Sequence, residues 1–264
     1  MFSCPTFKKV EFVDLLVNAP YYGHLLNIYG AIGFKKLNIT EAQQQELARR
    51  LGDFVNWFPN TQSPDLIDDP YYETLEVELQ NKKSRNEMIV EWSMDITRRS
   101  PIAGMLLNNV IFQCDKRAGS SLLVDMRKVY ELLKPEWRQF IDQIEWVDKE
   151  TKISRRMVEL HRNTNQKILL FSTEFGDLSD EHPRYKFFIN REELSDEEKK
   201  VFLKIIAEIL DIIHVCNLNI LEEWKWNEKD LLIVDGSCML QATKGGFKYG
   251  SRVIHKQVCV ATIP

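Results

Sequence analysis

Short apolar runs without helical periodicity dominate this chain and constrain its fold more than any other feature. Most of them have the length and the polar boundaries typical of β-strands. They are "AIGFKKL" (31–37), "GMLLNNVIF" (104–112), "SSLLVD" (120–125), "RMVELHR" (156–162), "KILLFS" (167–172), "NILEEWKW" (219–226), "DLLIVDG" (230–236) and "RVIHKQVCVATI" (252–263). Because they do not alternate regularly with helices, they favour an antiparallel core over a doubly wound sheet. We predict a mostly β fold with peripheral helices and a double-stranded β-helix, or jelly-roll, core.

Three segments nevertheless predict helices. Two begin with a capping box, in which a hydroxyl residue and a Gln or Glu three positions later satisfy free N–H groups. A shorter third segment should end at Lys134-Pro135, because proline interrupts a helix. The expected helices are about 41–55, with the box Thr40 and Gln43; from Ser195, with its partner Glu198, to about His214; and 125–133.

Composition limits the class of protein. The 264 residues can bury an ample core, and no linker or repeat divides them, so we expect a single domain over 1–264. A formal net charge of −4 without an isolated basic block argues against nucleic-acid binding. No leader or long apolar stretch is present, so we expect no membrane span and a cytoplasmic protein. Five widely spaced cysteines predict buried thiols rather than disulfides or a zinc site.

Short motifs do not identify a chemistry. Gly245-Gly246 lacks the remaining residues of a phosphate-binding loop, and there is no G-x-S-x-G nucleophile motif. The five histidines are isolated in the sequence, where a packed or solvated role is commoner than metal ligation. These residues alone therefore indicate only a soluble β-rich protein.

The order of several longer segments is more informative. They are "IYGAIGFKKLNITEAQQQELARRLGDF", "EWSMD", "SPIAGMLLNNVIF", "AGSSLLVDMRKVYELLKPEW", "VELHRNTNQKILLFS", "WKWNEKDLLIVDGSCMLQ" and "SRVIHKQV". Together, over about residues 25–260, they resemble the TauD/TfdA family. This is the taurine dioxygenase-like branch of the Fe(II)- and 2-oxoglutarate-dependent oxygenases, related to clavaminate synthase.

The resemblance implies an iron ion held by a His-x-Asp pair and a distal histidine. In this sequence the pair falls on Ser93 and Asp95 of "EWSMD", so Asp95 is the surviving metal ligand. The distal histidine falls on Gln241, six residues after Asp235 of the family's W-x-x-G-D-L-x-x-x-D-N pattern. Both family imidazoles are thus replaced by neutral oxygen-bearing side chains.

At four further positions of the family pattern, this sequence either keeps the family residue or has a different one. Arg252 lies eleven residues after Gln241, where the family's arginine pairs with the far carboxylate of 2-oxoglutarate. Ser121 takes the place of a threonine whose hydroxyl can hydrogen-bond the bound keto acid. Lys229 stands where the pattern has the glycine of its Gly-Asp pair. His161 resembles a family histidine that is not a ligand.

The missing histidines lead us to expect an atypical or metal-independent enzyme that acts on a small carboxylate or amino-acid-like metabolite. Its expected catalytic residues are Asp95, Ser93 and Gln241, with Arg252 and Ser121 binding a substrate or co-substrate carboxylate. This interpretation requires no cofactor. Two alternatives stay open: an Fe(II)/2-oxoglutarate oxygenase (hydroxylase or desaturase type) with an unusual ligand set, and a non-catalytic small-molecule-binding pseudoenzyme.

Two segments are the expected lids over the barrel, about 60–87 and 174–193. Both mix acidic and aromatic residues, and this mixture does not identify a ligand.

Overall fold

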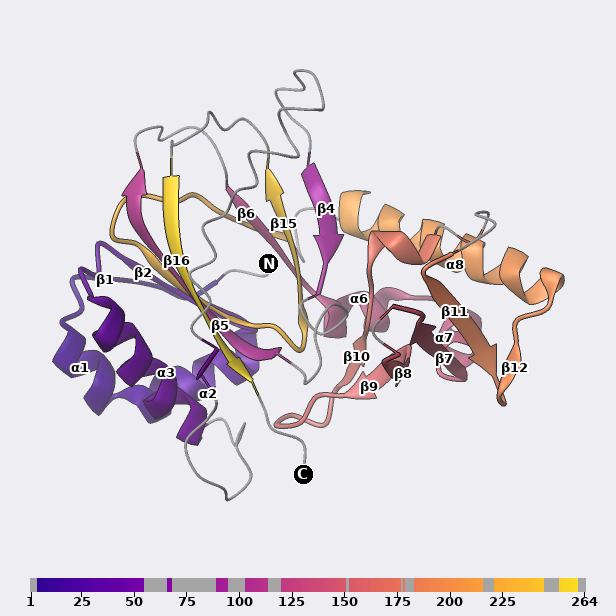
Figure 1. The fold of residues 1–264 in the computed structure, drawn as a ribbon, viewed down its shortest axis with the longest axis horizontal. Coiled ribbons are helices and arrows are strands. Elements are labelled where there is room, and N and C mark those ends of the chain that lie inside the picture. Colours follow the sequence, from indigo (N-terminus) through magenta and orange to yellow (C-terminus); the bar gives the residue numbers. More distant parts are fainter. Residues whose placement is uncertain are drawn as a thin grey trace.

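The computed structural model describes residues 4–54, 66–67, 89–94, 103–113, 120–150, 152–176, 178, 183–215, 221–244 and 252–260. Most described strands belong to two large sheets (Figure 1). The first has the strand order β1-β2-β14-β5-β16-β3, and the second β13-β6-β15-β4. Within them every described pair is antiparallel except β1 with β2. This arrangement agrees with the predicted antiparallel β core.

The apolar runs of the sequence predicted six of these ten described strands, and the strands at 6–8, 66–67, 89–93 and 239–244 were not predicted. The first sheet contains β1 Thr6–Lys8, β2 Ala31–Lys35, β14 Leu231–Asp235, β5 Ala103–Gln113, β16 Arg252–Val260 and β3 Leu66–Ile67. The second contains β13 Leu221–Trp224, β6 Ser121–Asp125, β15 Met239–Lys244 and β4 Ile89–Ser93.

Three helices cover the outer face of the first sheet: α1 Phe12–Val17, α2 Ala19–Tyr29 and α3 Glu41–Phe54 (Figure 1). Their buried apolar side chains form one cluster with Ile32 and Phe34 of β2 and with Ile233 of β14. Since successive strand residues point to opposite faces, Ala31 and Gly33 face the other way. Ala31 accordingly belongs to the second, larger apolar cluster.

The second large sheet packs against this other face. A Cβ added at Gly33 would lie 2.2 Å from Cη2 of Trp224, and one added at Gly30 would lie 2.4 Å from Sδ of Met239. Trp224 ends β13 and Met239 begins β15. These contacts identify the inward face of the second sheet, and the glycines allow its close approach.

A further group of elements lies beyond the second sheet (Figure 1). Its helices are α6 Met126–Leu132, α7 Pro135–Ile141, α8 Asp196–Val215 and the short 3-10 helix η1 Thr173–Gly176. Its strands are β7 Ile144–Asp148, β8 Ser154–Arg156, β11 Tyr185–Ile189 and β12 Glu192–Glu193, which form one sheet, and the pair β9 Val158–Leu160 and β10 Lys167–Leu169. Edge-to-face aromatic contacts of Phe175 with Tyr185 and Phe187 join these layers.

The helices with capping boxes form as predicted. The Thr40 N–H donates to Gln43 Oε1 at 2.8 Å and the Gln43 N–H to Thr40 Oγ1 at 3.3 Å, which closes the first box. At α8, Glu198 accepts hydrogen bonds from the backbone N–H and the hydroxyl of Ser195. The N–H of Glu198 donates back to Ser195 Oγ at 3.4 Å.

The prediction was incomplete at Lys134-Pro135. The helix α6 does end just before this pair, at Leu132. However, Pro135 also begins α7, because a proline at the first helical position loses no hydrogen bond and already has a helical φ. Helices α1, α2 and α7 and the sheet β12-β11-β7-β8 were not predicted.

The expected lid segments are described only in part. Of residues 60–87, only Leu66–Ile67 are described, as β3. Within 174–193, Tyr185 and Phe187 are buried in β11 and contribute to the larger apolar cluster. The lid roles and the single domain stay predictions.

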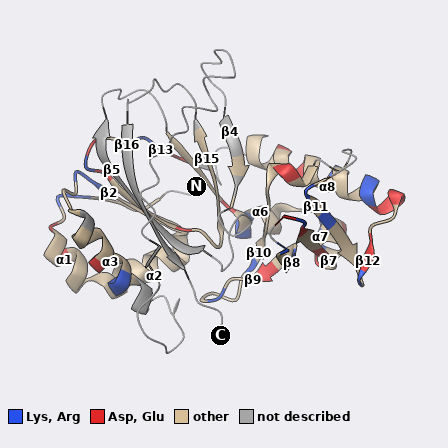
Figure 2. Ribbon diagram, viewed as in Figure 1, with Lys and Arg blue, Asp and Glu red and all other residues tan. Residues whose placement is uncertain are grey.

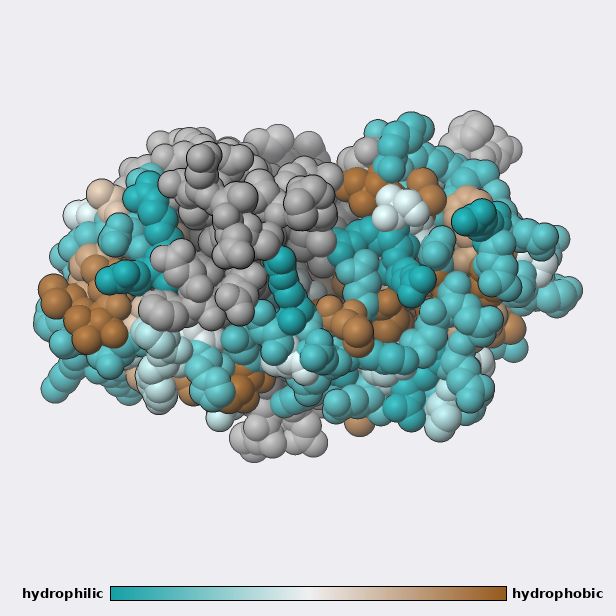
Figure 3. Space-filling view, turned by 90° about the horizontal axis from the view of Figure 1, so that it is seen from below, coloured by the Kyte–Doolittle hydropathy of each residue, from teal (hydrophilic) through white to brown (hydrophobic). Residues whose placement is uncertain are grey.

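The surface is largely hydrophilic. Positive and negative residues are interspersed along α8 (Figure 2), and the face in Figure 3 carries brown hydrophobic areas among teal ones. Val13 and Val17 of α1 are among the exposed large apolar residues. Among the described helices, none has the length and apolar character needed to cross a membrane. The two cysteines whose side chains are described, Cys4 and Cys238, are buried thiols that form no disulfide, as predicted for this residue type.

We predict that Gly33→Ala lowers the free energy of unfolding by about 1 to 3 kcal/mol, because its methyl group would overlap the buried Trp224 ring. Gly176→Ala is the matched control, since its Cβ would meet only Ile206 Cγ2, at an ordinary 3.5 Å. Urea unfolding of both variants measures the difference. Equal stabilities for the Gly33 variant and the unaltered chain would contradict the close sheet contact.

Candidate functional site

Two predicted site residues, distant in the sequence, are neighbours in the second sheet. Ser93 in β4 and Gln241 in β15 are direct antiparallel partners. The register between these strands shifts between Gln241 and Thr243, as at a β-bulge. Bulges often occur beside functional sites, where they redirect a side chain or end a pairing. The positions that correspond to the two family histidines therefore lie at one place in the fold.

Gln241 lies on the face of the second large sheet that is turned toward the first large sheet. Directly paired antiparallel residues share a face, as do residues two apart along a strand. Gln241 thus shares its face with Met239, whose sulfur approaches Gly30 of the opposite layer. In the next row on the same face, Thr243 pairs with Ser121 and Ser121 with Trp224. The inward face therefore carries a polar patch within an otherwise apolar core.

Only some of the hydrogen-bonding groups on this face have a partner among the described residues. The Trp226 indole N–H donates to Ser121 Oγ at 2.9 Å, which leaves the proton of that hydroxyl free to be donated. Gln241 is half-buried, and its amide makes no hydrogen bond to another described residue. Trp224 is buried, and its indole N–H has no hydrogen-bond partner. A ligand with hydrogen-bonding oxygens would satisfy these groups.

The structure describes less of the other two predicted site residues, Asp95 and Arg252. Asp95 lies outside the described residues. Arg252 is the first residue of β16, paired with Gln113 in the first large sheet, and its side chain is not described. The proposed meeting of Asp95, Gln241 and Arg252 in one site remains a prediction.

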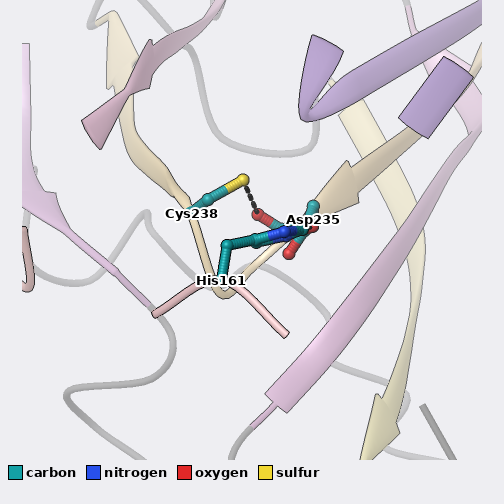
Figure 4. Close-up of side chains that lie close together, drawn as sticks. All are labelled: His161, Asp235 and Cys238. Carbon is teal, nitrogen blue, oxygen red and sulfur yellow. Dashed lines mark hydrogen bonds and ion pairs between the residues drawn. The ribbon is translucent and has the colours of Figure 1, made fainter. Parts of the chain in front are cut away.

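A second polar cluster, not predicted from sequence, surrounds Asp235 at the end of β14 (Figure 4). One carboxylate oxygen, Oδ2, lies 2.8 Å from His161 Nε2. The other, Oδ1, accepts from the Ser237 N–H at 2.9 Å and from its hydroxyl at 2.5 Å. The Asp235 N–H also donates to the Gly30 carbonyl at 2.7 Å. Both side chains of the His161–Asp235 pair are at most 1% exposed.

The hydrogen bonds of His161 fix its tautomer. The Thr164 N–H donates to His161 Nδ1 at 3.2 Å, and the Thr164 hydroxyl lies 2.9 Å from the same nitrogen. Nδ1 is therefore the acceptor, which places the proton on Nε2, where it is donated to Asp235. With both ring nitrogens occupied, His161 serves to hold the aspartate, in agreement with its expected non-ligand role.

Cys238 completes this cluster. Among the described residues, His161, Asp235 and Cys238 form a group whose ligand atoms lie close enough to hold a metal ion, within 4.8 Å of one another. Burial raises the pKa of the Cys238 thiol well above its usual value, and the negative charge of Asp235 raises it further. A metal ion would need the thiolate and would compete with the His161–Asp235 hydrogen bond. The geometry favours a structural cluster.

A buried ion pair stands beside the same turn. The Arg127 guanidinium donates to both carboxylate oxygens of Asp125, at 2.9 Å each. It also donates to the carbonyls of Asn27 and Ile28 near the end of α2, which lack helical partners. Burial disfavours the charge, but the hydrogen bonds to Asp125 hold the pKa of Arg127 above its usual value. This pair ties α2 to the end of β6.

The turn before β14 explains one departure from the family pattern. Lys229 occupies the position of the family's glycine and adopts φ +67°. This left-handed conformation suits glycine and costs other residues about 1 to 2 kcal/mol. The next residue, Asp230, is buried and accepts from Lys35 Nζ at 2.7 Å and the Asn227 N–H at 2.8 Å. The Gly-Asp pattern thus marks a backbone requirement that this chain meets with a lysine.

We expect His161→Ala to lower the free energy of unfolding by about 2 to 3 kcal/mol, because Asp235 would lose a buried hydrogen bond to its charged carboxylate. Thr164→Val is the control: it removes only the hydroxyl and keeps the N–H that binds His161. Chemical denaturation compares the two variants. A loss in the histidine variant no larger than in the valine variant would contradict the proposed role of this pair.

The raised pKa of Cys238 makes its thiolate rare in the folded protein, so the thiol should resist alkylation at about pH 8. Iodoacetamide treatment followed by peptide mass mapping is the measurement. The expected result is no modification of Cys238 in the folded protein and rapid modification in denaturant. Equal rates in both conditions would show that the thiol is accessible and ionised.

Several solved structures share this fold, and some of them are named as oxygenases. AAD-2, solved with Mn(II) and N-oxalylglycine, is 16% identical with a TM-score of 0.67, covering 100% of this chain and 96% of its own. A taurine dioxygenase from Burkholderia xenovorans is 12% identical with a TM-score of 0.67, covering 99% and 89%. PvcB, an Fe, α-ketoglutarate-dependent oxygenase from an isonitrile synthetic pathway, is 13% identical with a TM-score of 0.60, covering 92% and 79%. No curated protein matches the chain.

These likenesses imply the jelly-roll core that the sequence predicted, although the described strands form separate sheets and not one closed barrel. They also correct one expectation. The interpretation that no cofactor is required is wrong, because the related structures point to a metal ion and 2-oxoglutarate.

The family assignment itself rests on the sequence. The family described as "Taurine catabolism dioxygenase TauD, TfdA family" matches residues 18–259, which is most of the chain. The chain therefore belongs to the TauD/TfdA family.

Proposed function

We propose that this chain is an oxygenase of the 2-oxoglutarate-dependent type with an unusual ligand set. It binds a divalent cation and a small 2-oxo acid between its two large sheets, and it acts on a small carboxylate or amino-acid-like substrate. The observation that carries the proposal is the direct pairing of Ser93 with Gln241 on the inward face of the second sheet. A half-buried amide without a described partner at that position favours a bound ligand.

The donor set decides which cation fits. Ser93, Asp95 and Gln241 would offer a hydroxyl, a carboxylate and an amide, all oxygen donors, which suit cations such as Mn(II) and Mg(II). They do not fit the imidazole-rich iron centre that the family resemblance implies. Changes in residues that merely support metal ligands already cost roughly 10- to 100-fold in affinity, and here the ligands themselves differ. We therefore expect this site to bind an oxygen-ligated cation weakly. The keto acid should strengthen that binding. A redox-active cation such as Mn(II) would supply oxidative chemistry toward a substrate C–H bond, whereas Mg(II), which has no accessible change of oxidation state, would only bind and orient the keto acid.

The remaining residues would bind and orient the organic molecules. Arg252 is the expected partner of the far carboxylate of the 2-oxo acid, in the forked geometry of a guanidinium and a carboxylate. Ser121 has a hydroxyl proton to donate to the keto acid, since Oγ already accepts from Trp226. The names of the related structures, which include a taurine dioxygenase and a 2,4-D dioxygenase, favour a small-molecule substrate.

Titration with Mn(II), followed by electron paramagnetic resonance, tests the proposal. We expect weak binding that N-oxalylglycine strengthens, because a keto-acid analogue adds ligands to the cation. The double variant Ser93→His, Gln241→His should bind the cation at least about tenfold more tightly, since it restores two imidazole ligands.

The control is Val90→His, Thr243→His, which places two histidines at another paired position of the same two strands. It should gain little affinity. If neither histidine pair changes the affinity, the metal position is not at Ser93 and Gln241. Cation and keto-acid binding without turnover of any small carboxylate would favour the non-catalytic binding protein.

A further inference from the structure

An indole whose N–H has no hydrogen-bond partner among the described residues lies on the same face of the second sheet as Gln241, in the next row and two strands away. Trp224 is 3% exposed, and its N–H has no hydrogen-bond partner. A buried donor left unsatisfied costs about 1 to 3 kcal/mol, so such a group is retained more readily where a ligand can accept from it. The missing partner alone is not decisive, because Trp92, Trp137 and Trp146 also have buried indole N–H groups without one.

Position distinguishes Trp224 from the other three. Trp92 precedes Ser93 in β4, so it points to the opposite face of the second sheet, where it contacts His214 of α8. Trp146 packs between Phe175 and Tyr185 of the outer elements. Trp137 belongs to α7. Of the four, Trp224 is the one on the inward face that carries Gln241.

The spacing on this face suits one small ligand. Trp224, Ser121 and Thr243 form one row of direct partners, and Gln241 lies in the next row. Rows on one face are roughly 7 Å apart along the strands, and neighbouring strands are about 4.8 Å apart. A short dicarboxylate anchored near Gln241 can therefore reach the row that contains Ser121 and Trp224.

The hydrogen-bond donors in the row that contains Ser121 and Trp224 favour a ligand atom that accepts hydrogen bonds. Ser121 Oγ already accepts from Trp226, so Ser121 and Trp224 each have a proton to donate. In addition, Lys35 Nζ lies 3.6 Å from the centre of the Trp224 ring, and Asp230 holds it there through an ion pair of 2.7 Å. A cation over the ring withdraws electron density from the indole and makes its N–H a stronger donor. Because Asp230 balances the charge of Lys35, it is the protons of Ser121 and Trp224 that favour an oxygen acceptor.

We propose that the Trp224 indole N–H, together with the Ser121 hydroxyl, binds a carboxylate or keto oxygen of the small 2-oxo acid. This inference rests on the proposed function and adds a ligand-binding residue to it. Trp224 binds and orients the acid and takes no part in bond making.

Calorimetric titration of the Mn(II)-loaded protein with N-oxalylglycine tests the assignment. Trp224→Phe keeps the ring and its packing but removes the donor, and it should weaken binding at least about tenfold. Trp146→Phe is the matched control, because it removes an equally unpaired N–H from the outer elements, and it should bind within about twofold of the unaltered protein. Equal affinities of the Trp224 and Trp146 variants would overturn the inference while leaving the proposed function intact.

A second readout does not depend on the folding of a variant. The chain has six tryptophans, so protein labelled with 15N in its indoles gives up to six indole N–H signals. Addition of N-oxalylglycine to the Mg(II)-loaded protein should move one signal downfield, as a new hydrogen bond forms. Binding of the analogue with no moved signal would overturn the role of Trp224. No binding at all to the unaltered protein would refute the proposed function, and the inference with it.

Discussion

The hydrogen bonds of Asp235 join three parts of the structure at one buried carboxylate. Its oxygens accept from His161, which follows β9 among the outer elements, and from Ser237 in the turn that leads into β15. Its N–H binds the Gly30 carbonyl before β2. Because a buried charge without partners is costly, these contacts form together or not at all. They fix the turn from which β15 begins, and therefore the register that brings Gln241 opposite Ser93.

The space between the two large sheets combines close packing with unsatisfied polarity. At one end the second sheet touches the first through Trp224 over Gly33 and Met239 over Gly30. Beside these contacts, Gln241, the Ser121 hydroxyl and the Trp224 N–H have unused hydrogen-bonding capacity among the described residues. Their position in a TauD/TfdA-family fold supports a ligand rich in oxygen atoms.

Ser93 and Gln241 occur in the positions that the resemblance gave to imidazoles, and the strand register makes these positions neighbours. Lys229, which the resemblance sets against a glycine, adopts a left-handed conformation that glycine tolerates best.

Local signals in the sequence determined much of the secondary structure. The capping boxes at Thr40 and Ser195 specify the beginnings of α3 and α8, because they satisfy N–H groups within a single turn. The apolar runs determined most strands of the two large sheets. The ordered segments also indicated the family, which the family model confirms.

Only the tertiary structure decided how distant residues meet. No local pattern shows that His161 donates to Asp235 or that Trp226 donates to the Ser121 hydroxyl. Nor does any local pattern show that the Trp224 indole N–H has no hydrogen-bond partner among the described residues. Each of these facts depends on strand pairing and packing. The sheet β12-β11-β7-β8 escaped prediction for a related reason: strand preference reflects burial and neighbours more than the chain's own sequence. The sequence by itself determined the family and led to the prediction that Ser93 and Gln241 stand where the family has histidines. The fold decided that Ser93 and Gln241 are direct partners, because antiparallel register is set by contacts between segments far apart in the chain.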